Sequence, residues 1–267
     1  MLAKGLSVLR RVAVRGLQGL VVAGTLLYAG STLLRTGPSV LLDGWVVPLI
    51  GVGAGLLCLA RAVLVRQGRA AWAILGLGQG LYACGTIYWW RWVAPLEQQP
   101  YPSLADLLWL SFYPLAYVAV VLLVRQRIQR LQASMWLDGL VGGLGAAGLA
   151  AGLAFGTILD ATGGGVAAVA VYLTYPVADL LLLVVVMGAL GLMGGWPDRV
   201  LWLLALGMGG FAAADTINLF RQASGTFQPG TPLDALWVVA QTLVGLAAWR
   251  PPRLDRAARL EGWAVLA

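Results

Sequence analysis

The chain contains no histidine, and this absence excludes several classes of function at once. Without an imidazole there is no histidine-ligated metal site, no histidine general base and no phosphorelay histidine. Only two glutamates occur, Glu97 and Glu261, and neither a Walker loop nor a nucleophile-elbow motif is present. We therefore expect that the chain is not an enzyme, has no catalytic residues and uses no metal or other cofactor. A hydrolase built on Asp179 and Asp215 is chemically conceivable, but no motif supports it.

Charged side chains are scarce as well, at 11% of the residues against roughly 25% in soluble domains. Hydrophobic residues make up 60% of the chain, and the mean hydropathy is +0.83. Several apolar stretches exceed about 18 residues, which is long enough for a helix to cross the hydrocarbon core of a bilayer. The composition therefore predicts an all-α polytopic membrane bundle whose main partner is the lipid bilayer.

We predict eight transmembrane helices, with both cysteines, Cys58 and Cys84, packed as small apolar groups inside them. The expected spans are 17–34, 44–66, 70–91, 103–124, 136–159, 166–193, 199–221 and 232–249. Regularly spaced glycines in the third and fifth spans predict close contacts between helices, because small residues let helix backbones approach each other in lipid. These glycines are Gly76, Gly80, Gly148, Gly152 and Gly156.

The basic residues are distributed very unevenly between the two ends of the predicted spans. All but three of the 18 lysines and arginines lie at the end that holds both termini, and the exceptions are Arg35, Arg91 and Arg221. The positive-inside rule therefore predicts that both termini are cytoplasmic, with a basic N-terminus at 1–16 and a basic tail at 250–267. This asymmetry accounts for the net charge of +7, so we expect no nucleic-acid partner.

Residues 72–91 resemble residues 202–221 at a constant spacing, and the two segments share tryptophan, threonine and arginine at matched positions. Downstream, LADLLW at 104–109 matches PLDALW at 232–237, so that Asp106 corresponds to Asp234. We predict two transmembrane repeats of four helices, 17–124 and 136–249. Because each repeat has an even number of spans, both would run in the same direction, related by an axis along the membrane normal.

Aspartates at membrane depth are candidate site residues, because a carboxylate there is costly unless it is paired or hydrated. Asp179 is expected near the middle of its span and Asp215 in the outer half of its span. For both, a structural tether between helices is an equally good explanation. Asp106 and Asp234 lie in first helical turns, where helix capping explains them equally well.

We predict a polar cavity between the two halves that opens outward and binds a small ligand. Arg91 and Arg221 lie at the right depth to pair with Asp106 and Asp234, whereas Trp89, Trp90 and Trp92 are expected in an interfacial belt. The predicted ligand-binding residues are Asp179, Asp215, Tyr113, Tyr175, Thr86, Thr216, Asn218, Asp106, Asp234, Arg91 and Arg221.

A family resemblance is carried by four runs: PSLADLLWLSFYPLAYVAVVLLVRQR, WLDGL, YPVADLLLL and DALWVVAQTLVGLAAWRPPR. Over roughly residues 70–267 the chain resembles the membrane sensory region of actinobacterial GGDEF and GGDEF–EAL proteins, which make and degrade cyclic-di-GMP. The residues that match the recurring motifs are Ser103, Asp106, Tyr113 and Pro114, then Leu137, Asp138 and Gly139, and then Tyr175, Pro176 and Asp179.

The resemblance implies a multi-pass sensory module of a bacterial plasma membrane, normally coupled to a cytoplasmic cyclic-di-GMP output domain. No GGDEF or EAL signature occurs in the chain itself. We therefore expect the input part of a signalling protein, or a truncated or stand-alone relative, and the sequence leaves open whether the chain is truncated before an output domain. Two other functions stay open: a small transporter or channel with Asp179 and Asp215 as a proton or cation relay, and a structural membrane subunit. The sequence also leaves open the identity of the ligand and the formation of a homodimer.

Overall fold

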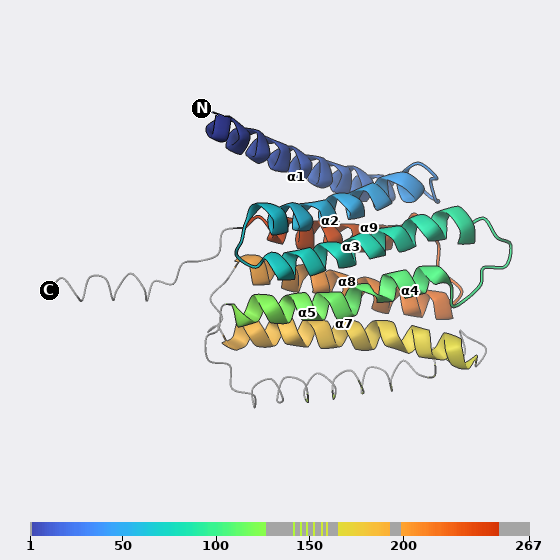
Figure 1. The fold of residues 1–267 in the computed structure, drawn as a ribbon. Coiled ribbons are helices and arrows are strands. Elements are labelled where there is room, and N and C mark those ends of the chain that lie inside the picture. The colour runs from blue at the N-terminus through green and yellow to red at the C-terminus, as the bar shows by residue number, and fades with distance from the viewer. Residues whose placement is uncertain are drawn as a thin grey trace.

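The computed structural model describes residues 2–126, 165–192 and 199–250, together with isolated helical positions between 141 and 159. Within these ranges the chain forms long helices that lie side by side along one direction (Figure 1). Most of the predicted fifth span at 136–159 lies outside the described residues, as do Leu137, Asp138, Gly139 and the tail from 251 onward.

The described chain begins with helix α1 (Leu2–Leu34), which a short loop joins to the π-helical turn η1 (Leu42–Val46). Turn η1 continues directly into α2 (Val47–Leu64). Helix α3 (Arg69–Tyr88) likewise continues into a second π-helical turn, η2 (Trp89–Val93). The helices that follow are α4 (Leu104–Leu110), α5 (Phe112–Arg125), α7 (Val166–Leu192), α8 (Arg199–Ala223) and α9 (Pro232–Ala247).

Six of these helical segments are long and apolar enough to cross a membrane. They are Leu9–Leu34, Leu42–Leu64, Arg69–Val93, Leu104–Arg125, Val166–Gly188 and Arg199–Gln222, and α9 is a shorter apolar helix. Large apolar side chains such as Leu20, Leu49 and Val63 are exposed on the outer surface of the bundle, where lipid would cover them. The predicted helical membrane bundle is confirmed at this level, while the eight spans and the repeat stay predictions.

Glycines bring the helices into close contact. A Cβ atom on Gly55 of α2 would lie 3.2 Å from the carbonyl oxygen of Gly76 in α3, and one on Gly245 of α9 would lie 2.9 Å from the Cα atom of Ala54. The expected role of Gly76 at a helix contact is therefore confirmed. No such contact is found among the described atoms for Gly80, Gly148, Gly152 and Gly156, where an added Cβ atom would have none of them within 4 Å. Of the two free cysteines, Cys58 is buried as expected, whereas Cys84 lies on the exposed face of α3.

The two ends of the bundle differ in charge. The starts of α1, α3 and α8 lie at the same end as the ends of α2, α5 and α9, and we call this the proximal end (Figure 1). Helix α7 also runs toward it. The proximal end carries Arg10, Arg11, Arg15, Arg61, Arg66, Arg69, Arg125, Arg199 and Arg250, whereas Arg35, Arg91 and Arg221 lie toward the opposite, distal end.

Candidate functional site

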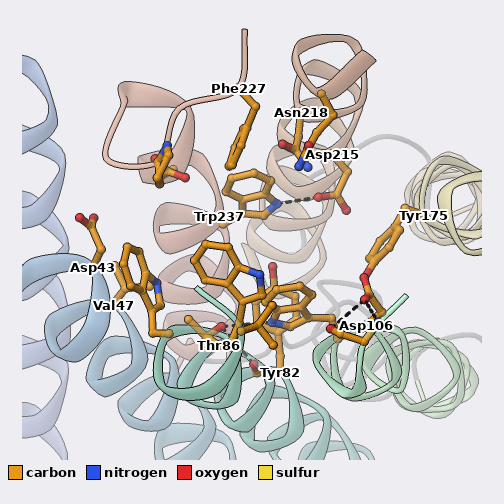
Figure 2. A pocket seen from close by; sticks show the side chains of 18 of the residues that line it. Asp43, Val47, Tyr82, Thr86, Asp106, Tyr175, Asp215, Asn218, Phe227 and Trp237 are labelled. Carbon is orange, nitrogen blue, oxygen red and sulfur yellow. Dashed lines mark hydrogen bonds between the residues drawn. The ribbon is translucent and has the colours of Figure 1, made fainter. Parts of the chain in front are cut away.

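A cavity of about 370 Å³ lies at the distal end of the bundle, and this volume is in the range of small-molecule sites. Its walls come from the distal ends of α3 and α8, from the first turns of α4 and α9, and from the distal part of α7. Residues of the two distal loops, such as Tyr101 and Phe227, complete the lining. The cavity is therefore formed jointly by the first and the second half of the chain (Figure 2).

Aromatic rings and carboxylates dominate the lining. The rings belong to Tyr28, Tyr82, Trp89, Trp90, Tyr101, Trp109, Tyr172, Tyr175, Phe227 and Trp237, and the carboxylates to Asp43, Asp106, Asp215 and Asp234. Among the residues that the structure describes, no lysine or arginine lines the cavity. Trp89 and Trp90 therefore line the cavity, whereas Trp92 is exposed, and the interfacial belt stays a prediction.

A chain of hydrogen bonds runs from the cavity into the bundle through Asp215. The indole Nε1 of Trp237 donates to Asp215 Oδ1 over 2.7 Å. The hydroxyl of Tyr113 lies 2.9 Å from Asp215 Oδ2 and 2.9 Å from Asp179 Oδ1. A phenol has one proton and can donate to only one of these carboxylates at a time. Trp237, Asp215, Tyr113 and Asp179 thus connect four helices, α9, α8, α5 and α7.

Asp179 lies behind the cavity and is almost completely buried, with 2% of its surface exposed. Its Oδ2 atom has no hydrogen-bond partner within the described part of the chain. A buried polar atom without a partner costs free energy, so a proton or a cation shared between the two carboxylates would stabilise this arrangement. The predicted proximity of Asp179, Asp215 and Tyr113 is therefore found, although Asp179 and Tyr113 do not line the cavity.

Asp106 and Asp234 cap their helices and also line the cavity. Asp106 Oδ2 accepts a hydrogen bond from the backbone N–H of Ser103 over 2.7 Å, and Asp234 Oδ2 accepts one from Thr231 over 2.8 Å. Both pairs are capping boxes, so the structural interpretation of these two aspartates is confirmed. Asp106 additionally accepts a hydrogen bond from the Tyr175 hydroxyl over 3.1 Å, which joins α4 to α7.

The remaining predicted residues are divided between the cavity and the surface of the bundle. Thr86 lines the cavity and accepts a hydrogen bond from Trp109 Nε1 over 3.2 Å. Asn218 also lines it, and its Oδ1 atom is buried without a partner in the described residues. Thr216 points outward, because a helix that turns Asp215, Asn218 and Gln222 toward the cavity turns the residue after Asp215 away.

Arg91 and Arg221 do not pair with Asp106 and Asp234 in the part of the chain that the structure describes. The guanidinium of Arg91 lies 3.9 Å from the ring centre of Trp45, because the π-helical turn η2 carries it toward η1. Arg221 donates to Thr231 Oγ1 over 3.4 Å. Both arginines lie outside the cavity, so the expectation that they take part in ligand binding is not supported by their positions.

The sequence analysis missed Asp43, which lines the cavity with only 2% of its surface exposed. Arg35 forms a bidentate ion pair with it, with Nη1 2.6 Å from Oδ2 and Nη2 2.5 Å from Oδ1. The Tyr28 hydroxyl donates to Asp43 Oδ1 over 2.7 Å. The sequence does contain a signal for this pair: an arginine and an aspartate flank the short loop between two spans.

The loop between η2 and α4 covers one side of the cavity with Tyr101. Its ring lies 4.3 Å from that of Tyr172 in α7, measured between ring centres. Burial raises the pKa of the Tyr101 phenol above its ordinary value, with a smaller contribution from the negative charge of Asp106. The phenol is therefore neutral at pH 7 and supplies an uncharged rim.

Toward the proximal end, apolar side chains replace the polar ones. Leu182 and Val186 follow Asp179 along α7, Leu123 follows Tyr113 along α5, and Leu204 and Met208 precede Asp215 on α8. All five belong to one buried cluster. Within the described residues, the hydrogen-bonded chain from the cavity therefore ends at Asp179, and an apolar cluster lies between it and the proximal end.

No protein-family model matches the chain, and comparisons with curated proteins and with solved structures find no significant match. The geometry of the cavity therefore carries the functional assignment.

Proposed function

We propose that the protein is an integral membrane sensory module that binds a small ligand in the distal cavity and acts on a cytoplasmic cyclic-di-GMP output domain. The observation that carries this proposal is the chain from Trp237 through Asp215 and Tyr113 to Asp179. A ligand at Asp215 would change the contacts between α5, α7, α8 and α9 at their centre. The ligand would shift the equilibrium between two arrangements of these helices to the extent that it binds one arrangement more tightly than the other.

The orientation belongs to the same proposal. The arginine-rich proximal end faces the cytoplasm and the cavity faces the opposite side of a bacterial plasma membrane, with both chain ends inside. Eight spans in two four-helix repeats agree with the helix neighbours. In the proposed repeat, α2 corresponds to α7, α3 to α8, and α5 to α9. The contact of α2 with α3 then corresponds to that of α7 with α8, and the contact of α2 with α9 corresponds to that of α7 with α5. Each of these pairs is related to its counterpart by the proposed repeat.

The coding sequence that follows Ala267 tests the coupling to an output domain. A GGDEF or EAL domain in the same reading frame would support covalent coupling to cyclic-di-GMP chemistry. A stop codon directly after Ala267 would contradict covalent coupling, and the sensory role would then depend on a separate output protein.

Fusion of a diguanylate cyclase domain after Ala267 tests the sensory role itself through the cyclic-di-GMP content of intact cells. Asp215→Asn and Asp179→Asn should each change this content, because they alter the chain of hydrogen bonds that leads from the cavity into the bundle. The matched control is Glu97→Gln, which removes a negative charge from the distal loop outside the cavity. Equal cyclic-di-GMP content in all four fusions would contradict a sensory role for the cavity.

A proton or cation transporter is the second candidate, favoured by the adjacent carboxylates of Asp179 and Asp215 and by the partnerless Asp179 Oδ2. The apolar cluster toward the proximal end argues against a continuous path. Proton uptake by proteoliposomes under an imposed membrane potential separates the two functions. The sensory proposal predicts the rate of empty liposomes, whereas uptake that Asp179→Asn abolishes would establish the transporter.

A further inference from the structure

We propose that the ligand of the distal cavity is a small organic ammonium cation. This inference names the ligand class of the proposed sensory cavity and therefore depends on that cavity being the ligand site. It rests on the charge of the lining, on its aromatic surface and on the spacing of the carboxylates.

The charge of the lining is negative and largely uncompensated. Within the described residues, Asp106, Asp215 and Asp234 have no basic partner, and their hydrogen-bond donors are backbone N–H groups, phenols, an indole and the Ser103 hydroxyl. Arg35 is held in its bidentate pair with Asp43, and Arg221 donates to Thr231 Oγ1. Carboxylates with low-dielectric walls concentrate negative potential, which favours a ligand with positive charge.

The aromatic surface suits a cation whose charge is spread over methyl or methylene groups. Rings reach the cavity from several elements: Trp90 from η2, Trp109 from α4, Tyr175 from α7 and Trp237 from α9. Tryptophan and tyrosine faces attract ammonium groups through their quadrupoles, and they bury the apolar substituents of the cation at the same time. A hydrated inorganic ion would gain nothing from such walls.

The carboxylates are too far apart for a metal ion. Figure 2 shows Asp43, Asp106 and Asp215 on different walls of the cavity. In the described ranges, no three carboxylates or thiols come together as a metal site. A calcium or magnesium ion needs about six oxygen ligands at roughly 2.0–2.6 Å, so this arrangement does not satisfy it. A larger cation can contact an aromatic wall and one or two of the carboxylates.

The test compares choline with its uncharged isostere 3,3-dimethylbutan-1-ol on the full chain in detergent micelles, with tetramethylammonium and ethanolamine as further ammonium probes. Binding is followed by tryptophan fluorescence, because four tryptophans line the cavity, and by isothermal titration calorimetry. We expect saturable binding of at least one ammonium probe, and we expect choline to bind at least about tenfold more tightly than the isostere, a difference typical of one lost charge contact. This comparison uses the wild-type protein and does not depend on the folding of a variant.

Asp215→Asn should weaken ammonium binding by about tenfold or more, whereas Glu97→Gln should change it by less than about twofold. Equal binding of choline and the isostere would overturn the assignment and identify an apolar site. Failure of all three ammonium probes to bind the folded protein would overturn it as well. If the cyclic-di-GMP fusions still responded to Asp215→Asn, the sensory function would survive and only the ligand class would be wrong.

Discussion

Asp43 and Asp215 line the same cavity, but their surroundings are opposite. Asp43 accepts hydrogen bonds from a guanidinium, a phenol and a backbone N–H, so its charge is fully compensated. Asp215 accepts hydrogen bonds from an indole and a phenol, and the second carboxylate, Asp179, shares that phenol. We infer from this difference that Asp43 holds α2 against α1, whereas Asp215 is available to a ligand or a proton.

A similar difference is found between the helix pair α3–α4 and the pair α8–α9, which match each other in sequence. In α3 and α4, Trp109 packs against Gly85, where a Cβ atom would lie only 2.8 Å from the indole, and its Nε1 donates to Thr86. In α8 and α9, Trp237 donates instead to Asp215, which occupies the position that matches Gly85. The indole of the first pair packs against a glycine and that of the second pair binds a carboxylate, so the carboxylate at this matched position occurs in the second half alone.

The largest effect is expected from Asp43→Ala, which leaves the guanidinium of Arg35 without its partner in a largely buried site. Removing one member of a buried ion pair typically lowers the free energy of unfolding by about 3–5 kcal/mol. Unfolding of the purified protein in detergent measures this loss. Asp215→Asn serves as the comparison, and an equal loss in both variants would remove the distinction between the two carboxylates.

Replacing either matched tryptophan by phenylalanine removes an indole N–H and a similar volume from each helix pair. Trp237→Phe should cost about 1.5–3 kcal/mol, because the lost hydrogen bond goes to a charged group. Trp109→Phe should cost about 0.5–1.5 kcal/mol, because its acceptor is a neutral hydroxyl. Chemical unfolding of the two variants gives the difference directly. The reverse order would show that Asp215 is uncharged or that its bond to Trp237 is weak.

Gly85→Ala should destabilise the α3–α4 contact by about 1–3 kcal/mol, because the added methyl group would overlap the rigid indole of Trp109. Gly80→Ala in the same helix is the matched control, since none of the atoms that the structure describes lies within 4 Å of a Cβ atom there. It should leave the midpoint of thermal unfolding unchanged or slightly higher. Helix propensity favours alanine at both positions, so similar destabilisation by both changes would show that the overlap with Trp109 is not the cause.

The smallest effect on stability is expected from Asp179→Asn. The amide keeps the shape and most of the hydrogen bonding of the carboxylate, so the free energy of unfolding should change by less than about 1 kcal/mol. The cyclic-di-GMP content of cells that carry the fused protein should nevertheless no longer respond to the ligand. Strong destabilisation with an unaltered response would establish Asp179 as a structural tether between helices.

The sequence predicted the membrane bundle and much of the cavity, because both follow from rules that act locally along a helix. Apolar length identified the helices, and intramembrane position identified Asp179 and Asp215. The capping interpretation of Asp106 and Asp234 followed from their places in first turns. Thr216 was placed wrongly because it was assigned to the cavity together with its neighbour Asp215, without regard to the direction in which successive helical residues point.

Other features depended on contacts between elements that sequence reasoning did not join. The ion pair of Arg35 with Asp43 spans a loop, and Arg35 was used in the sequence analysis only to predict orientation. Arg91 left the expected site because α3 ends in a π-helical turn, which no pattern in the sequence marked. Trp89 and Trp90 face the cavity because of the same turn, although their position near the end of a span is also typical of an interfacial belt.

The proposed orientation requires that the cavity at Asp215 is reached from the side of the membrane opposite the cytoplasm. Asn218→Cys, in a background of Cys58→Ala and Cys84→Ala, tests it with a membrane-impermeant maleimide, and Gln222→Cys on the exposed rim serves as the positive control. We predict that the cysteine at position 218 reacts in intact cells and that choline slows the reaction. Reaction at this position only in inverted membrane vesicles would contradict the account.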